Sequence, residues 1–383
     1  MKVLYVDQTG ALGGGEIAIL PWICHARAGA SVILFEDGPF RDMLEQCGVP
    51  VEILTINNLR GIRRESDIGA LFRIVPTFLR LRTRLAAKAS DFDIVYANSQ
   101  KAFLVAALSR HKRQPLVWHL RDILTAEHFS PVLRRIAVGF GNRFATVVIT
   151  NSQATADAFV AAGGKRSKVR VVYDGVSPEP FDRVNPAEVQ ALRRELGGES
   201  AILVGHFGRI SHWKGQHILL EAIRELPDVH AVLVGDALFG ESDYAGKVRA
   251  LASVPELRGR VRFLGFRRDI PALMKSMDLV VHTSTAPEPF GLVIVEGMLA
   301  NRPVIATAAG GALEILGCGS KGNLGLLTAP GSVGELRSAI RWLLDHPGEG
   351  EQLAAHARKR AFEKFSLEQL FSALTSILKG VAK

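Results

Sequence analysis

Residues 202–215 read ILVGHFGRISHWKG, and this stretch decides how the second half of the chain is interpreted. A strand-forming run, Ile202–Phe207, leads into a glycine-bearing loop, and a helical pattern follows over 215–226. In open α/β sheets, ligands bind where such loops follow the carboxyl ends of the strands. Gly208, Arg209 and Lys214 lie in this loop, and a guanidinium with an ammonium can hold a diphosphate.

Short apolar strands alternate with longer helical patterns on both sides of this stretch. Downstream strands are expected at Ala231–Val234, Val261–Phe263, Leu279–His282 and Pro303–Ala306. Upstream strands are expected at Val3–Val6, Ser31–Phe35, Asp93–Ala97, Leu116–His119, Thr146–Thr150 and Val169–Val172. A turn-rich stretch at 174–180 interrupts the alternation, and Pro186 then opens a short charged helix. We therefore predict an α/β protein with two doubly wound, parallel-sheet (Rossmann-like) domains.

The composition agrees with a folded two-domain chain. With 383 residues, 48% hydrophobic and 22% charged, it excludes disordered, collagen-like and coiled-coil classes. Three cysteines without C-x-x-C spacing predict neither a disulfide framework nor a zinc site. The first residues are too short an apolar run for a signal peptide, and no run is long enough to span a membrane. We expect a cytoplasmic protein.

The net charge of +9 is unevenly distributed. Residues 1–180 carry 23 basic and 16 acidic side chains, which is +7, so an anionic partner is expected on that side. Residues 60–88 are a basic amphipathic segment. It is either a surface helix packed on the sheet, or a peripheral contact with the anionic inner face of a membrane. No compact recognition motif for nucleic acid is present.

A glycine cluster, Gly13-Gly14-Gly15, follows the first strand. Backbone N–H groups there can approach a phosphate. With Ala18, and with Glu36 or Asp37 about 20 residues on, the cluster formally fits a dinucleotide fingerprint, so an NAD(P)-dependent oxidoreductase is an alternative. Six residues separate Val6 from Gly13, however, whereas that fingerprint starts directly after its strand.

Residues 287–296 read PEPFGLVIVE and predict an anion-binding helix start. Because the first N–H groups of a helix have no partner within the helix, we expect those of Phe290, Gly291 and Leu292 to bind the anion. Glu288 precedes the helix and Glu296 lies near its second turn, about 6–9 Å along the axis. That offset suits a ligand that contains a sugar, a diphosphate and a ribose.

Together these stretches resemble the family 4 retaining glycosyltransferases (glycosyl transferases group 1) of the GT-B fold. The resemblance rests on Glu288-x7-Glu296 with its Pro289-Phe290-Gly291 core, on Pro303–Ala306 with Gly310-Gly311, and on Gly208-Arg209…Lys214-Gly215. Gly13-Gly14-Gly15-Glu16, Gly235-Asp236, Phe263–Phe266 and Asp278-Leu279-Val280 are similar to further landmarks of that family. The loop after Gly235 is bulkier than usual, and Asp174 stands where the family commonly has Asn.

The resemblance implies two domains facing a central cleft and metal-independent transfer of a hexose from a UDP- or GDP-linked sugar to a hydroxyl acceptor, with no further cofactor. It implies an acceptor domain at 1–176 completed by a helix at about 366–383, a linker at 177–199 and a donor domain at 200–365. The catalytic residues would be His119, Glu288, Arg209 and Lys214. The donor-binding residues would be Gly14, Gly15, Gly208, Arg209, Lys214, Phe266, Arg267, Glu288, Phe290, Gly291, Leu292 and Glu296. The acceptor would be a saccharide or a lipid-linked saccharide in cell-surface polysaccharide or glycolipid synthesis; a non-catalytic carbohydrate-binding protein is the second alternative.

Overall fold

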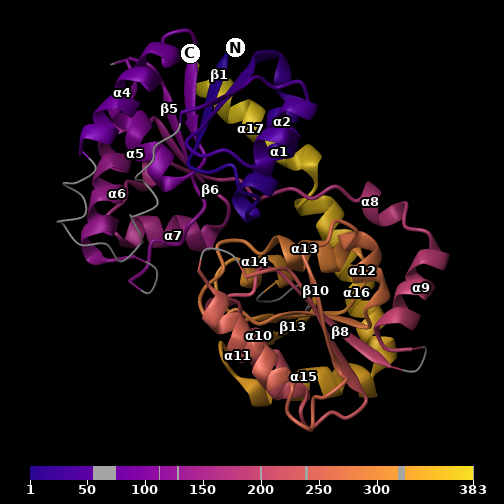
Figure 1. Ribbon diagram of the computed structural model, residues 1–383. Coiled ribbons are helices and arrows are strands. Elements are labelled where there is room, and N and C mark those ends of the chain that lie inside the picture. The colour runs from indigo at the N-terminus through magenta and orange to yellow at the C-terminus, as the bar shows by residue number, and fades with distance from the viewer. Residues whose placement is uncertain are drawn as a thin grey trace. The chain divides into compact units, whose positions relative to one another are not determined.

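The chain forms two compact units, each built on one parallel sheet (Figure 1). The computed structural model describes residues 1–54, 75–111, 113–126, 129–198, 201–237, 240–317 and 324–382. The first unit comprises Met1–Gly175 and Leu367–Lys383, and the second comprises Val176–Ser366.

The first unit has a seven-stranded sheet in the order β3-β2-β1-β4-β5-β6-β7, with every pair parallel. The strands are β1 (Val3–Asp7), β2 (Ala30–Leu34), β3 (Val51–Ile53), β4 (Ile94–Ala97), β5 (Leu116–Leu120), β6 (Val147–Thr150) and β7 (Val169–Val171). The strand order reverses between β1 and β4. At such a switch point the loops separate and leave room for a ligand at the carboxyl edge.

Helices cover both faces of this sheet. One apolar core lies under α4 (Val75–Ala89), α5 (Gln100–Ser109), α6 (Pro131–Phe144) and α7 (Gln153–Ala161). The opposite core lies under α1 (Gly14–His25), α2 (Pro39–Gln46) and α17 (Leu367–Val381). The yellow C-terminal helix α17 therefore belongs to the unit that the N-terminus begins (Figure 1).

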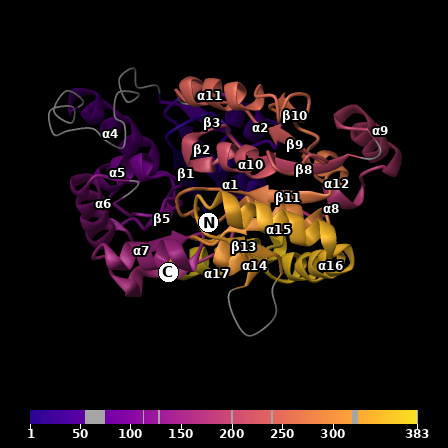
Figure 2. The same ribbon diagram turned by 90° about the horizontal axis from the view of Figure 1, so that it is seen from below.

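The second unit has a six-stranded parallel sheet in the order β10-β9-β8-β11-β12-β13, with its switch point between β8 and β11. The strands are β8 (Ile202–Phe207), β9 (Val229–Val234), β10 (Val261–Gly265), β11 (Leu279–His282), β12 (Val304–Thr307) and β13 (Leu326–Thr328). Its helices are α8 (Glu179–Asp182), α9 (Pro186–Leu196), α10 (Gln216–Ile223), α11 (Ser242–Ala252), α12 (Ile270–Ser276), α13 (Leu292–Leu299), α14 (Ala312–Leu316), α15 (Val333–Asp345) and α16 (Pro347–Lys364). Figure 2 shows α10 and α15 of this unit from a second side.

The predicted fold class is confirmed, since both units are doubly wound parallel sheets. Expecting a linker at 177–199 was wrong for its described part, because α8 and α9 belong to the second unit. Leu192 and Leu196 of α9 are buried. Arg193 fastens the helix by donating to both carboxylate oxygens of Asp278, at 3.1 Å each. The buried leucines and the two hydrogen bonds from Arg193 to Asp278 make α9 part of the second unit.

The sequence-based expectation of no disulfide was also wrong. Cys24 and Cys47 are bonded to one another, with their Cα atoms 5.5 Å apart. Cys24 lies in the last turn of α1 and Cys47 directly follows α2. The two helices pack against each other on one face of the sheet, which brings together cysteines that the sequence separates. Cys318 lies outside the described residues.

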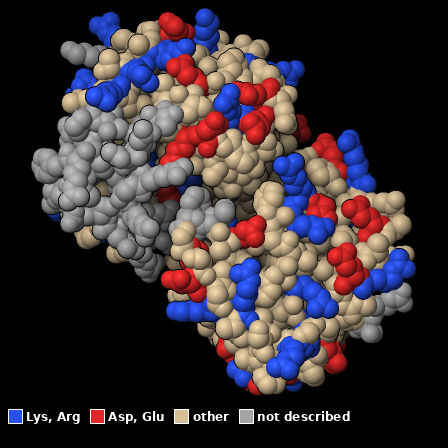
Figure 3. Space-filling model, in the orientation of Figure 1, with Lys and Arg blue, Asp and Glu red and all other residues tan. Residues whose placement is uncertain are grey.

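The basic segment 60–88 is described from residue 75 onward, as α4. Leu81, Leu85 and Ala89 of α4 are buried in the core of the first unit. Arg80 and Arg84 are exposed, and Lys and Arg side chains gather over α4 at the upper left of Figure 3. For this part of the segment, the apolar stripe packs on the sheet as a surface helix does. None of the described helices combines the length and apolarity needed to cross a bilayer.

Candidate functional site

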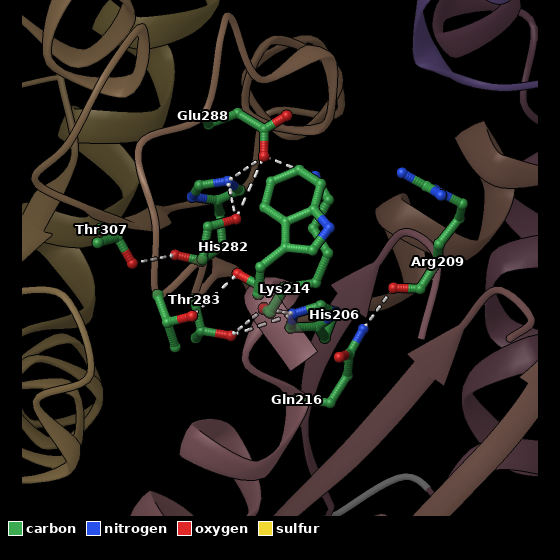
Figure 4. A network of polar contacts seen from close by, with 11 residues as sticks. His206, Arg209, Lys214, Gln216, His282, Thr283, Glu288 and Thr307 are labelled. Atoms are coloured by element: carbon green, nitrogen blue, oxygen red, sulfur yellow. Dashed lines mark hydrogen bonds and ion pairs between the residues drawn. The ribbon is translucent and has the colours of Figure 1, made fainter. Parts of the chain in front are cut away.

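The phosphate loop predicted from the sequence, residues 208–215, lies at the switch point of the second unit. Neighbouring side chains brace its backbone (Figure 4). Gln216 is buried and donates from Nε2 to the carbonyl oxygen of Arg209 at 2.8 Å. Thr283 Oγ1 donates to the carbonyl oxygen of Lys214 at 3.0 Å. Gly215 has a φ of 71°, and a Cβ there would lie 2.0 Å from the carbonyl oxygen of Thr283, so only glycine fits.

Lys214 and Glu288 point toward one another in Figure 4. Lys214 Nζ lies 2.6 Å from Glu288 Oε2, and the two side chains are only 14% and 12% exposed. The ammonium also sits 4.2 Å from the centre of the Trp213 ring. A charge-assisted hydrogen bond that is largely shielded from solvent is stronger than one in water. The sequence placed both residues at the donor site, and the structure brings them into direct contact.

The Glu288 carboxylate is held ionised by its neighbours. Burial opposes ionisation, but the Lys214 charge and the hydrogen bond from His282 outweigh it and hold the pKa of Glu288 well below its usual range. His282 Nε2 lies 3.3 Å from Oε2, and Ser284 Oγ donates to the same oxygen at 3.2 Å. Every one of these contacts involves Oε2, which leaves Oε1 available to a ligand as far as the described residues show.

Gly310 and Gly311 explain why the loop that carries Glu288 takes this course. Gly311 N donates to the Glu288 carbonyl oxygen at 2.8 Å. Gly310 has a φ of 64°, and a Cβ on it would lie 2.1 Å from that same oxygen. Side chains at either position would push the Glu288 loop away from the switch point. The paired glycines of the sequence motif thus position a carboxylate.

Glu296 has a different environment. It lies in α13, which begins at Leu292 after Gly291 in the left-handed conformation. Its carboxylate makes no hydrogen bond or ion pair with the side chains that the structure describes around it. Burial alone raises the pKa of Glu296 to about 7. A partly buried carboxyl group without a partner is suited to accept hydrogen bonds from hydroxyl groups of a ligand.

The other residues of this unit that the sequence predicts to bind the donor lie on two loops. Phe290 is buried, with its ring centre 5.6 Å from that of Phe365, so its ring packs in the interior of the unit. Phe266 is 59% exposed after β10, and its N–H is held by Asp236 Oδ2 at 2.9 Å. Arg267 pairs with Asp269 at 2.5 Å. An exposed aromatic ring on a fixed backbone is a suitable surface for a nucleobase.

His119, Gly14 and Gly15 belong to the first unit. Gly14 and Gly15 lie in the first turn of α1, which follows β1 at the switch point between β1 and β4, and His119 lies in β5, next to β4. His119 is fully buried in β5, and Gly14 opens α1. Burial and the charge of Arg121 hold the pKa of His119 well below its usual range. The ring is therefore neutral.

A polar network that the sequence did not predict surrounds these residues. Asn98 Nδ2 donates to Asp7 Oδ2 at 2.6 Å, and Asn98 Oδ1 accepts from Arg121 Nε at 2.7 Å. Arg121 Nη1 donates to Asp174 Oδ1 at 2.8 Å, so Arg121 forms its ion pair 53 residues away in sequence. Asp174, flagged only as a departure from the family pattern, is this partner. The sequence did contain a signal for this network. Three of its residues, Asp7, Asn98 and Arg121, lie at or directly after the end of a strand, and these ends meet at one edge of the parallel sheet.

Models of two domain families match the chain. The "Glycosyl transferase 4-like domain" matches residues 20–175, and "Glycosyl transferases group 1" matches residues 190–360. The 2-deoxystreptamine glucosyltransferase of Streptomyces kanamyceticus is 33% identical over 54% of this chain. That match spans only about half (53%) of the relative's own length. The sulfoquinovosyl transferase SQD2 of Arabidopsis thaliana is 26% identical over 83% of this chain and 62% of its own.

Solved structures extend the likeness to the whole chain. HepE of Anabaena, solved in complex with UDP-glucose, is 42% identical over 99% of this chain and 100% of its own, with a TM-score of 0.89. The complex of HepE with UDP and glucose gives 41% identity and the same TM-score. Sucrose-phosphate synthase of Thermosynechococcus elongatus, at 20% identity and a TM-score of 0.80, shares the fold. The GT-B fold is thus confirmed, and the chain belongs to the group 1 glycosyltransferases, the family that its sequence motifs resembled.

Proposed function

We propose that the chain is a retaining glycosyltransferase that transfers a hexose from a UDP-sugar, with UDP-glucose as the first candidate, to a hydroxyl acceptor. The observation that carries this proposal is the buried Lys214–Glu288 pair beside the braced loop 208–215. In this proposal the Lys214 ammonium would bind the diphosphate, and the adjacent Glu288 carboxylate would bind hydroxyls of the sugar. The UDP-glucose complex of HepE, 42% identical over nearly the whole length, supports the choice of donor.

The charges at the site favour a reaction in which the leaving diphosphate is stabilised by the protein. Lys214 and Arg209 would neutralise the negative charge that develops on the diphosphate as the bond from the sugar C1 to the phosphate oxygen breaks. In this proposal the cationic side chains stabilise the leaving diphosphate, as a metal ion does in other transferases. Activity is then expected to persist in a chelator.

Glu288 is unsuited to be the base. A carboxylate whose pKa lies well below the usual range takes up a proton poorly at neutral pH. Its open Oε1 can accept a hydrogen bond from a donor-sugar hydroxyl. The acceptor oxygen would therefore attack C1 on the face that the diphosphate leaves, and its proton would pass to the departing phosphate oxygen. Glu296 would accept hydrogen bonds from the ribose hydroxyls, and Phe266 with Arg267 would border the nucleobase.

The acceptor is proposed to be a saccharide, free or lipid-linked, in the synthesis of a cell-surface polysaccharide or glycolipid at the inner face of the membrane. The relatives include a lipopolysaccharide core mannosyltransferase, LpsB of Rhizobium meliloti, at 25% identity. Contact with an anionic membrane through α4 would be mainly electrostatic, because Leu81 and Leu85 are buried in the core, although Leu79 is exposed beside Arg80. A dinucleotide-dependent oxidoreductase is not proposed, because that alternative does not fit the family.

The proposal is tested with a panel of UDP-, GDP- and ADP-sugars, with release of the nucleoside diphosphate as the readout. We expect turnover of a UDP-hexose, with retained configuration in the product by NMR and no loss of rate in EDTA. Glu288→Gln and Lys214→Ala should each lower kcat at least 100-fold, roughly 2.7 kcal/mol of transition-state stabilisation. Arg224→Gln, which breaks an exposed ion pair of the same unit, is the matched control and should stay within twofold.

Three results would count against the proposal. If UDP does not raise the melting temperature of the protein, the proposed binding site for a UDP-sugar is contradicted. UDP binding without turnover of any sugar would point to a non-catalytic carbohydrate-binding protein. Near-normal kcat in both Glu288→Gln and Lys214→Ala would sink the assignment of the catalytic pair.

A further inference from the structure

His119 carries a hydrogen-bonding pattern that the transfer reaction proposed above does not yet use. Val117 and His119 alternate with Trp118 along β5, so His119 points to the sheet face that holds Tyr5, Tyr96 and Ile149. Its side chain is fully buried. A buried imidazole has two nitrogens to satisfy, and here they are treated differently.

Two donors converge on His119 Nδ1. Tyr96 Oη lies 2.6 Å from it, and Arg121 Nη2 lies 3.2 Å from it. A guanidinium only donates hydrogen bonds and does not lose its proton in proteins, so Nδ1 must accept. Burial keeps the pKa of Tyr96 well above its usual range, and its hydroxyl therefore also keeps its proton and donates. With Nδ1 as acceptor, the single proton of the neutral ring lies on Nε2.

Arg121 cannot easily move away from this position. Its Nε donates to Asn98 Oδ1 at 2.7 Å, and its Nη1 donates to Asp174 Oδ1 at 2.8 Å. The third corner of the guanidinium, Nη2, is the one directed at His119. The same side chain packs against the first turn of α1, since a Cβ on Gly15 would lie 3.0 Å from Arg121 Cδ. Arg121 thus contacts both the imidazole and the start of α1.

The opposite nitrogen is left without a partner. Nε2 of His119 is buried and makes no hydrogen bond to any residue that the structure describes. Buried donors without partners are rare in folded proteins, and each one calls for an explanation, such as a ligand that supplies the missing acceptor. The site lies at the carboxyl edge beside the switch point, where ligands of α/β sheets bind.

We propose that Tyr96 and Arg121 are positioning residues that lock His119 in the neutral Nε2–H tautomer, so that His119 donates a hydrogen bond to an oxygen of the sugar substrate and does not act as a base. The role toward the sugar rests on the proposed function, but the tautomer does not. The ligand group is a hydroxyl or ring oxygen, because the vacant position on the ring is a donor. Arg121 is the charged group that acts on His119, and Asp174 and Glu16 act in turn on Arg121.

The tautomer is tested directly by ¹⁵N NMR of the full-length protein labelled at histidine. The His119 signals are assigned by their loss in His119→Gln. We expect the pattern of a protonated Nε2 and an unprotonated Nδ1, unchanged between pH 6 and 8. A proton on Nδ1, or a ring that titrates in this range, would overturn the proposal whether or not the protein proves to be a transferase.

The role of the tautomer is tested by kinetics. The side-chain amide introduced by His119→Gln can still donate near the Nε2 position, whereas His119→Phe keeps the ring volume without a donor. We expect His119→Gln to retain at least 10-fold more kcat than His119→Phe. An equal loss of kcat in the two variants would exclude the donor role. It is the result expected of a base, because neither an amide nor a phenyl ring can take up the proton.

The positioning role has a matched control. Tyr96→Phe and Arg121→Lys each remove a donor to Nδ1. Lysine is chosen at position 121 because it keeps a positive charge beside Asp174, so that the variant still folds. Tyr5→Phe removes an equally buried hydroxyl of the paired residue on β1, which bonds to Trp22 at 2.8 Å and not to His119. We expect kcat to fall about 10-fold in the first two with little change in KM, and less than twofold in Tyr5→Phe. Equal effects in all three would reduce Tyr96 and Arg121 to structural residues.

Discussion

Glu288 and Glu296 belong to one sequence motif, yet their surroundings shift their pKa values in opposite directions. Both lose water on burial, which raises the pKa of a carboxyl group. Glu288 gains an ammonium at 2.6 Å and two hydrogen-bond donors, so its pKa falls. Glu296 gains none of these from the described residues, and its pKa rises to about 7. The Glu288 carboxylate is therefore already ionised and held in place, while the Glu296 carboxyl group becomes fully ionised only above neutral pH.

Glu296→Gln is therefore expected to change stability in a pH-dependent way. The folded pKa of about 7 lies above the ordinary 4.5, so Glu296 destabilises the fold progressively as the pH rises from about 4.5 through 7. Replacing it should raise Tm at pH 8 and leave Tm unchanged at pH 4.5, while weakening UDP binding at pH 8. Calorimetric scans and titrations at both pH values measure this. Glu349→Gln, an exposed site on α16, is the control; the same Tm change at both pH values in Glu296→Gln would contradict the prediction.

At this scale the sequence predicted residues of the proposed donor site but not the side chains that contact them. Lys214, Glu288 and Glu296 were predicted because they belong to short motifs. His282 and Ser284, which bind the Glu288 carboxylate, could not be chosen among many polar residues without the course of the loop. Asp174 could not be matched to Arg121, because 53 residues separate them and only the sheet brings them together.

Among the strands, the edge strands β3 and β13 were missed, whereas the edge strands β7 and β10 were predicted. β3 and β13 have three residues each and are largely half-buried, so neither shows the continuous apolar run of a central strand. Central strands such as β8 and β11 were predicted at their observed ends, because both faces of each are covered by helices. The helical pattern near the C-terminus was also found, but periodicity does not say which sheet a helix covers.

α17 presents Leu370, Leu374 and Leu378 to the core of the first unit. These three leucines recur every fourth residue and are almost fully buried. Phe371 adds a ring contact with His25 of α1, with ring centres 4.4 Å apart. The helix is therefore a structural layer of this unit.

Leu374→Ala should lower the free energy of unfolding of the first unit by about 2–5 kcal/mol, because a fully buried leucine is truncated and a cavity remains. Urea unfolding followed by Trp fluorescence measures the loss, since Trp22 lies in the same core. Ser372→Ala, at an exposed position of the same helix, serves as the comparison and should stay within about 0.5 kcal/mol. Equal stability of the two variants would show that α17 is not an integral part of the core.

Over the whole molecule, positive charge is unevenly distributed between the two halves of the chain, and the proposed donor site does not explain this. Arg209 and Lys214 lie in the second unit, whereas most of the excess of +9 lies in residues 1–180. The face in Figure 3 shows basic and acidic side chains interspersed over much of the surface, with basic groups gathered over α4. Arg80 and Arg84 are exposed there, while Arg82 is engaged with the carbonyl oxygen of Leu108 at 2.8 Å.

Binding to anionic vesicles through α4 is tested by changing only its exposed charges. The double variant Arg80→Gln/Arg84→Gln should weaken co-sedimentation with phosphatidylserine vesicles about 10-fold or more, at about 1 kcal/mol for each charge. Lys247→Gln/Arg258→Gln removes the same charge from exposed positions of the second unit. Equal binding by the two double variants would refute a role for α4, and the effect should vanish in high salt.

The position of α17 also sets the order in which a newly made chain can fold. The first unit contains residues from both ends of the chain, so its last helix leaves the ribosome only after the entire second unit. At roughly 5–20 residues per second, a nascent first sheet waits tens of seconds or less with one apolar face partly uncovered. The second unit, continuous in sequence, can complete itself during that interval. A chain that stops at Ser366 would carry a complete second unit and a first unit that still exposes apolar surface, which would make it a substrate for chaperones and proteases.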